Sequence, residues 1–178
     1  MEKFKHIKRI CIIGGPGTGK TTLSNNLAKE LNLPVYHIDG IHHLENWQIR
    51  DKEERDKIIL NIVDEEKWII DGTYKSTLAA RIKSADIVIF LNYSKIARLK
   101  GILSRYFKNK GKEKPDIPGC REKMDLTFIK MTLNWNNGRV NMIENIIEEN
   151  KNKEVYVFKN RRKLNKWYKN EFGKKIEL

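Results

Sequence analysis

The chain has 178 residues, of which 39% are hydrophobic and 33% charged, a composition typical of one globular domain with a buried core. No apolar run approaches the ~20 residues that a membrane-spanning helix needs, and no export signal is visible, so we expect a cytoplasmic protein without a membrane partner. The 36 Lys and Arg residues exceed the 23 Asp and Glu residues, and the net charge of +13 favours contact with polyanions such as nucleotides or nucleic acid.

The first predicted elements are a buried strand over 9–13 and a helix over 21–31. The turn between them reads Gly14-Gly15-Pro16-Gly17-Thr18-Gly19-Lys20-Thr21, which matches the phosphate-binding loop (P-loop) G-x-x-x-x-G-K-[ST]. Such a loop points backbone N–H groups at phosphates, while its lysine reaches the β- and γ-phosphates and its threonine holds Mg²⁺. We therefore expect a bound nucleoside triphosphate, held by this loop, with Thr21 as a Mg²⁺ ligand.

Strands and helices alternate along the rest of the chain. Further strands are predicted at 33–38, 67–70, 86–91 and 154–158, and helices at 51–63, 77–84, 95–107, 121–149 (broken near 136–138) and 161–172. Residues 41–50 and the polar stretch 108–119 have no regular pattern. This alternation predicts an α/β fold, a three-layer sandwich with a five-stranded parallel sheet. We expect one domain over 1–178, with residues 108–120 as a lid.

Two carboxylates, Asp39 and Asp71, directly follow predicted strands. Ligands of open α/β sheets gather at the carboxyl ends of strands, which is also where the P-loop lies. Asp71 can hold a Mg²⁺-bound water or order Lys20, and Asp39 can bind the acceptor or receive the proton of its hydroxyl. A purely structural Asp-Gly turn is the alternative for each.

Basic residues dominate the predicted lid and the helix before it. Arg98 and Arg105 lie seven residues apart on one helix, so they share a face. Phosphoryl transfer requires cations over the transferred group, because its oxygens carry the developing charge. We expect both arginines to contact phosphate, whereas most of the neighbouring lysines fit a solvated surface.

These motifs resemble the nucleoside monophosphate kinase branch of P-loop proteins. The segments 34–39 and 68–74, with Pro115-Asp116 and Gly119-Cys120, extend the resemblance over nearly the whole chain to the bacterial DNA topology modulation protein (FlaR-related) family. The resemblance implies an adenylate-kinase-like core that binds ATP and Mg²⁺ and phosphorylates a small acceptor, with Thr22 helping the P-loop to hold ATP and Mg²⁺. It also implies that Asp71 is the metal-proximal aspartate, that Arg98 and Arg105 are lid arginines, and that Arg161 lies near the adenine.

One departure concerns the acceptor. Nucleoside monophosphate kinases continue Asp-Gly with Phe-Pro-Arg, whose arginine grips the acceptor phosphate, whereas this chain continues with Thr73-Tyr74-Lys75. Lys75 or Arg81 would have to replace that arginine. The identity of the acceptor therefore stays open.

Two main functions fit the sequence. The first is a small-molecule kinase for a nucleoside-like or nucleotide-like acceptor, held between Asp39, Trp47, Tyr74 and Arg81. The second is a nucleic-acid-binding ATPase or regulator that affects DNA topology, supported only by the basic residues near the C-terminus. No nucleic-acid-binding module is visible. A kinase acting on polynucleotide ends would combine the two.

Overall fold

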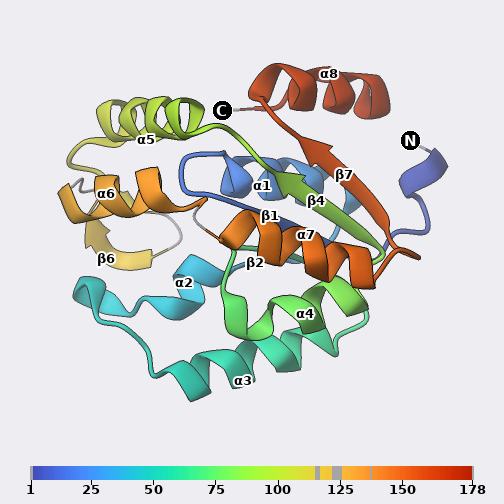
Figure 1. Ribbon diagram of the computed structural model, residues 1–178, viewed down its shortest axis with the longest axis horizontal. Helices are drawn as coiled ribbons and strands as arrows, with labels where there is room; N and C mark the ends of the chain where they lie inside the picture. The colour runs from blue at the N-terminus through green and yellow to red at the C-terminus, as the bar shows by residue number, and fades with distance from the viewer. Residues whose placement is uncertain (1, 115–116, 122–125, 137, 178) are drawn as a thin grey trace.

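The computed structural model describes residues 2–114, 117–121, 126–136 and 138–177 (Figure 1). Its centre is a five-stranded parallel sheet with the order β2-β3-β1-β4-β7. These strands are β1 (Arg9–Gly14), β2 (Val35–His37), β3 (Trp68–Asp71), β4 (Ile87–Leu91) and β7 (Glu154–Phe158). The predicted parallel α/β sheet is confirmed.

Helices cover both faces of the sheet, because successive residues of the buried strands point in opposite directions. Ile10 and Ile12 of β1 pack with α1 (Lys20–Leu31) and α8 (Arg161–Phe172) on one face. Cys11 and Ile13 pack on the other face with α3 (Lys52–Val63), α4 (Lys75–Ser84) and α7 (Arg139–Glu149) (Figure 1). The result is the expected three-layer sandwich, with Cys11 buried as a free thiol.

Two segments that we predicted to be irregular contain regular structure. Residues 41–50 include the end of α2 (Ile38–His42) and η2 (Glu45–Trp47), so Asp39 lies in a short helix rather than in a strand-end turn. The stretch 108–119 includes β5 (Glu113–Lys114) and most of β6 (Ile117–Arg121), which pair antiparallel. The side chains of Ile117 and Cys120 are buried and anchor β6, which explains the regular structure of this stretch. Pro115 and Asp116 lie outside the described residues.

The predicted helices agree with the structure at most of their ends. Ser94 caps α5 (Lys95–Asn109), where its hydroxyl accepts a hydrogen bond from the Ala97 N–H. The helix predicted over 121–149 consists of α6 (Leu126–Asn134) and α7, separated near the expected break. No helix in the described part of the chain is both long and apolar enough to cross a bilayer.

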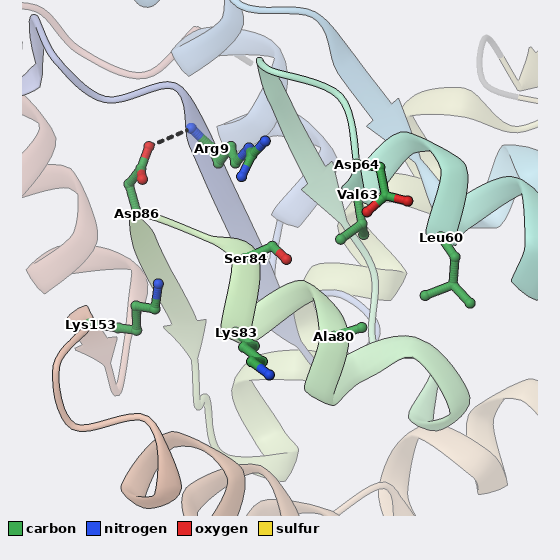
Figure 2. Close-up of a pocket in the computed structure, with 9 residues that line it drawn as sticks. All are labelled: Arg9, Leu60, Val63, Asp64, Ala80, Lys83, Ser84, Asp86 and Lys153. Carbon is green, nitrogen blue, oxygen red and sulfur yellow. Dashed lines mark hydrogen bonds between the residues drawn. The ribbon is translucent and has the colours of Figure 1, made fainter.

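A surface depression of about 680 Å³ lies at the amino ends of the strands (Figure 2). Asp86, which precedes β4, accepts hydrogen bonds there from the backbone N–H groups of Lys8 and Arg9. These bonds join the starts of β1 and β4. The P-loop and both candidate aspartates lie toward the opposite, carboxyl end of the sheet.

Candidate active site

The P-loop links the end of β1 to the start of α1, and close packing requires its glycines. Gly17 and Gly19 have φ values of 74° and 84°. Residues other than glycine rarely adopt this backbone conformation. A Cβ atom at Gly17 would lie 2.3 Å from the Arg98 carbonyl oxygen, and one at Gly19 would lie 2.4 Å from a terminal nitrogen of Arg161. The two helices α5 and α8 therefore pack directly against the loop.

Lys20 lies at the start of α1, where its Nζ donates to the Gly15 carbonyl at 3.2 Å. Burial lowers the pKa of Lys20, against the opposing charges of Asp39 and Asp71. The nearby charge of Arg105 lowers this pKa further. The structure thus brings three predicted site residues, Asp39, Asp71 and Arg105, close enough to act on the P-loop lysine.

Asp71 is the last residue of β3, and its side chain is almost completely buried. Its Oδ2 accepts a hydrogen bond from the Ser24 hydroxyl at 2.6 Å and lies 2.6 Å from His37 Nδ1. The other ring nitrogen of His37 lies 3.1 Å from Asn25 Oδ1. Because both close contacts use Oδ2, they leave Oδ1 unoccupied by these two groups.

Asp39 lies at the surface, two residues beyond β2. Its Oδ1 accepts a hydrogen bond from the Tyr74 hydroxyl at 3.1 Å. Burial by itself would raise the pKa of Asp39, but the charges of Lys20 and Lys114, together with the Tyr74 hydrogen bond, hold it below its usual value. Asp39 is therefore an anion at neutral pH that interacts with the P-loop lysine.

A group of ring side chains adjoins Asp39, and we call it the aromatic band: His42, His43, Trp47 and Tyr74. Its ring centroids are 4.7 Å apart for His42 and His43, 5.0 Å for His42 and Tyr74, and 5.4 Å for His43 and Trp47. The Lys114 Nζ lies 5.2 Å from the Trp47 ring centroid. Trp47 and Tyr74 therefore lie where the sequence suggested an acceptor pocket, whereas Trp68 is fully buried in the core, as expected.

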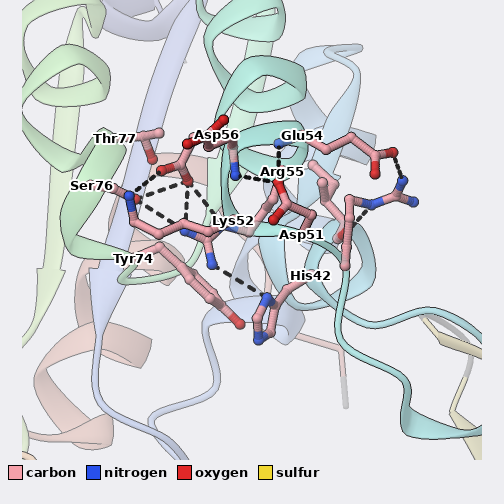
Figure 3. Close-up of polar contacts among 12 residues, drawn as sticks. His42, Asp51, Lys52, Glu54, Arg55, Asp56, Tyr74, Ser76 and Thr77 are labelled. Carbon is pink, nitrogen blue, oxygen red and sulfur yellow. Dashed lines mark hydrogen bonds and ion pairs between the residues drawn. The ribbon is translucent and has the colours of Figure 1, made fainter.

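Arg55 of α3 contacts two members of the aromatic band, His42 and Tyr74 (Figure 3). Its guanidinium carbon lies 4.9 Å from the Tyr74 ring centroid. Two of its nitrogens donate to Asp56 Oδ1, at 2.9 and 2.6 Å, and one of these also donates to Ser76. A third nitrogen lies 3.4 Å from His42 Nδ1. Arg55 was not predicted as a site residue, although its spacing from Ile59 and Ile62 places it on the buried face of α3.

Arg81 does not have the role that we predicted for it. The side chain is fully buried and donates to the carbonyl oxygens of Gly72 and Tyr74, each at 2.9 Å. It also donates to the Thr77 hydroxyl at 3.2 Å. Arg81 therefore holds the turn after β3 in place, and the expectation that it grips the acceptor is wrong.

Arg98 also differs from its predicted position on an accessible lid surface. It is fully buried, and its terminal nitrogens donate to the carbonyl oxygens of Tyr93 and Thr132, at 2.9 and 2.8 Å, and to the Asn136 side chain. A Cβ atom on Gly15 would lie 2.5 Å from the Arg98 Cδ. Arg98 thus connects α5, α6 and the P-loop, so we correct its role from a catalytic group to a positioning residue.

Gly101, in the middle of α5, was not singled out in the sequence. A Cβ atom there would lie only 2.0 Å from the Gly17 carbonyl oxygen. The backbone of α5 therefore touches the P-loop backbone at this point. A glycine inside an otherwise helical run was the available signal, since glycine weakens a helix and needs a packing reason.

Comparisons with known proteins agree with this architecture. A family model described as an AAA domain matches residues 9–90. A stretch of 33 residues is 54% identical to adenylate kinase 2 of Synechocystis sp., covering 18% of this chain and 18% of that protein. A stretch of 93 residues is 30% identical to 4-hydroxy-3-methylbut-2-enyl diphosphate reductase of Gloeobacter violaceus, covering 52% of this chain and 22% of that protein. The chain thus matches only about a fifth of the length of each of these curated relatives.

Among solved structures, shikimate kinase from Acinetobacter baumannii in complex with shikimate is similar over 99% of this chain and 99% of its own. The TM-score is 0.50 and the sequence identity is 17%. At this identity the likeness concerns the fold. Together with the P-loop at the carboxyl end of a parallel sheet, it shows that the chain has the α/β fold of P-loop NTPases.

Proposed function

We propose that this P-loop protein is an ATP-dependent small-molecule kinase, which transfers the γ-phosphoryl group to a hydroxyl of its acceptor. The single observation that carries the proposal is that Lys20 and Asp39 lie close enough for their charges to interact. The charge of Asp39 raises the pKa of Lys20, and the charge of Lys20 lowers the pKa of Asp39. A phosphate-binding lysine therefore lies within electrostatic reach of an exposed carboxylate that can receive an alcohol.

The donor side of this site would be the P-loop, Gly14 to Thr22. Arg161 lies against Gly19 at the start of α8, which supports a position near the adenine of ATP. Lys20 and Arg105 would bind the phosphates, since the two cations lie close enough for the charge of Arg105 to lower the pKa of Lys20. The similarity to an adenylate kinase and to a shikimate kinase supports a phosphotransferase.

The donor set at the strand end also fits Mg²⁺. Thr21 lies in the first turn of α1, and Asp71 has an oxygen that His37 and Ser24 do not use. Both supply the hard oxygen ligands that Mg²⁺ prefers. In this proposal the ion would be held mainly by the phosphates and by water. The ion would neutralise charge on the β- and γ-phosphates.

The transfer step would use groups that this chain places together. The acceptor oxygen attacks the γ-phosphorus, the bond to the β–γ bridging oxygen breaks, and ADP leaves with that electron pair. The proton of the hydroxyl passes to the Asp39 carboxylate. A carboxylate with a lowered pKa is a weak base, but a loose phosphoryl-transfer transition state needs little proton abstraction. Positioning of the hydroxyl is then the larger contribution of Asp39.

The finer parts of the proposal concern domain, family and compartment. We place residues 1–178 in a single domain, with 108–120 as the lid that excludes water on closing. The resemblance to the FlaR-related family supports membership there and a cytoplasmic location. A nucleic-acid-binding ATPase or regulator of DNA topology is the less favoured function, and duplex DNA binding measured at two salt concentrations would test it.

The experiment that tests the kinase function is ATP turnover by the Lys20→Ala variant in the presence of a mixed pool of nucleosides, nucleotides and sugars. We expect ADP production to fall to background, because the phosphates lose their principal cation. Lys29→Ala is the matched control, since Lys29 lies on the same helix but is exposed and paired with Glu177. ATP consumption at the wild-type rate by Lys20→Ala would contradict the proposal.

A further inference from the structure

We infer that the acceptor is an uncharged alcohol built on a ring, such as a nucleoside or a sugar, and not a phosphorylated or carboxylated compound. This inference rests on the kinase function proposed above and narrows its acceptor. Three features of the acceptor side carry it: the charge of Asp39, the partners of the neighbouring arginines, and the rings of the aromatic band.

The first feature is a negative charge where the acceptor would bind. Asp39 is exposed, and its lowered pKa keeps it ionised throughout the neutral range. The Tyr74 hydroxyl already donates to one of its oxygens, and the second oxygen can accept from an alcohol. A phosphate or carboxylate at this place would instead meet a like charge, which disfavours its binding.

The second feature is that three arginines near the band bind groups of the protein itself. Arg81 is fully buried and donates to carbonyl oxygens. Arg55 is 7% exposed and is held by Asp56 and Ser76 (Figure 3). Arg50 donates to the Ile41 carbonyl and pairs with Glu54. Arginine forks are the usual means of recognising phosphates and carboxylates, and here all three forks bind the protein itself.

Lys114 of the lid is a cation on the acceptor side. Its Nζ lies over the Trp47 ring, and its charge acts on Asp39. A single ammonium group paired with a carboxylate gives no net positive charge for an anionic acceptor. The charge of Arg105 acts on Lys20, and in the proposed site both cations would bind the triphosphate.

The third feature is the shape and chemistry of the aromatic band. The successive ring centroids lie 4.7, 5.0 and 5.4 Å apart, and the ring planes cross at 74°, 58° and 81°, so the band offers weakly polar ring faces and ring edges beside Asp39. Such surfaces favour a planar base or the apolar face of a sugar ring through stacking. A hydroxyl on the same ring system can then reach Asp39 while the ring lies against the band.

The test measures kcat/KM for matched acceptor pairs at saturating ATP. The pairs are adenosine and AMP, thymidine and TMP, ribose and ribose 5-phosphate, and glucose and gluconate. We expect the uncharged member of the best-used pair to be preferred by about tenfold or more, because its competitor carries a charge of the same sign as Asp39. In Asp39→Asn, the preference should shrink even though turnover falls, whereas Asp64→Asn, an exposed aspartate at the end of α3, should keep it.

The outcomes separate this inference from the function on which it depends. Preferred phosphorylation of a charged member overturns the uncharged acceptor and leaves the kinase function intact. A preference that is unchanged in Asp39→Asn also overturns the inference, because the repelling charge would then have no effect. Phosphorylation of no compound in either class overturns the kinase function and the inference together.

Discussion

His37 Nδ1 lies 2.6 Å from Asp71 Oδ2, at the point where β2 and β3 pair in parallel with these two residues in register. The other ring nitrogen lies 3.1 Å from Asn25 Oδ1 of α1. His37 therefore fixes the candidate metal-proximal carboxylate relative to the helix that begins at the P-loop. Residues in this position orient a ligand without touching the ion.

We predict that His37→Ala weakens Mg²⁺-dependent turnover. Asp71 keeps its hydrogen bond from Ser24 but loses the second group that fixes its orientation. Loss of such a partner typically costs about 10- to 100-fold in metal affinity or activity. A Mg²⁺ titration of ATP turnover should show a higher half-saturating concentration. His6→Ala, a change at an exposed histidine, is the control, and an unchanged Mg²⁺ dependence in His37→Ala would exclude the positioning role.

A second prediction concerns the contact between α5 and the P-loop. The methyl group of Gly101→Ala would lie 2.0 Å from the Gly17 carbonyl oxygen. Helix α5 and the P-loop must therefore move apart. We expect the free energy of unfolding to fall by about 1–3 kcal/mol, as for other overpacked sites, and the KM for ATP to rise. Urea denaturation and steady-state kinetics measure the two effects. Ser104→Ala, on an exposed position of the same helix, should change neither.

A third prediction is that variants of the two predicted lid arginines have different effects: a change at Arg98 lowers stability, whereas a change at Arg105 lowers activity. Arg98→Lys removes the fork that joins Tyr93, Thr132 and Asn136, so we expect a loss of about 2–4 kcal/mol in the free energy of unfolding. Arg105→Ala should leave stability within about 0.5 kcal/mol but reduce kcat by about 100-fold, as for loss of one charge-stabilising donor. Equal effects of both variants on stability would contradict this assignment.

A fourth prediction concerns the pH dependence of stability. Burial, with the charges of His43 and Arg55, lowers the pKa of His42 below its usual 6.5. Between the lowered value and 6.5 the unfolded chain binds more protons than the folded one, so stability falls as pH decreases through this window. Urea midpoints at pH 7.5 and 5.5 should differ less in His42→Asn than in the wild type. An equal difference would show that His42 is not responsible.

The sheet and the P-loop could be predicted from the sequence because both depend on local signals. The apolar runs of β1 and β4 are long enough to identify buried strands, and the P-loop pattern specifies its own backbone geometry. Ser94 was identified as a helix cap for the same reason. Asp39 and Asp71 were found because residues at the carboxyl ends of parallel strands gather at one edge.

The roles of individual arginines could not be predicted in this way. Arg81 and Arg98 were expected at the ligand because of their charge, yet both are fully buried and bond to carbonyl oxygens distant in the chain or across a turn. Helical spacing gives the face on which an arginine lies, but it does not say what covers that face. His37 was likewise missed as a partner of Asp71, since the contact depends on the register between two strands.

The most direct test of the proposed function follows the γ-phosphate itself. ATP labelled at the γ-phosphorus is incubated with the wild-type protein or Asp39→Asn and with the acceptor that supports the fastest ADP release. We predict that the label appears in a phosphate ester of the acceptor, about 100-fold or more slowly in Asp39→Asn. The amide has one acceptor oxygen, so it can neither accept hydrogen bonds from both Tyr74 and the acceptor hydroxyl nor take up the hydroxyl proton. Label released only as inorganic phosphate, or transferred equally fast by Asp39→Asn, would contradict a kinase in which Lys20 and Asp39 face each other across the transferred group.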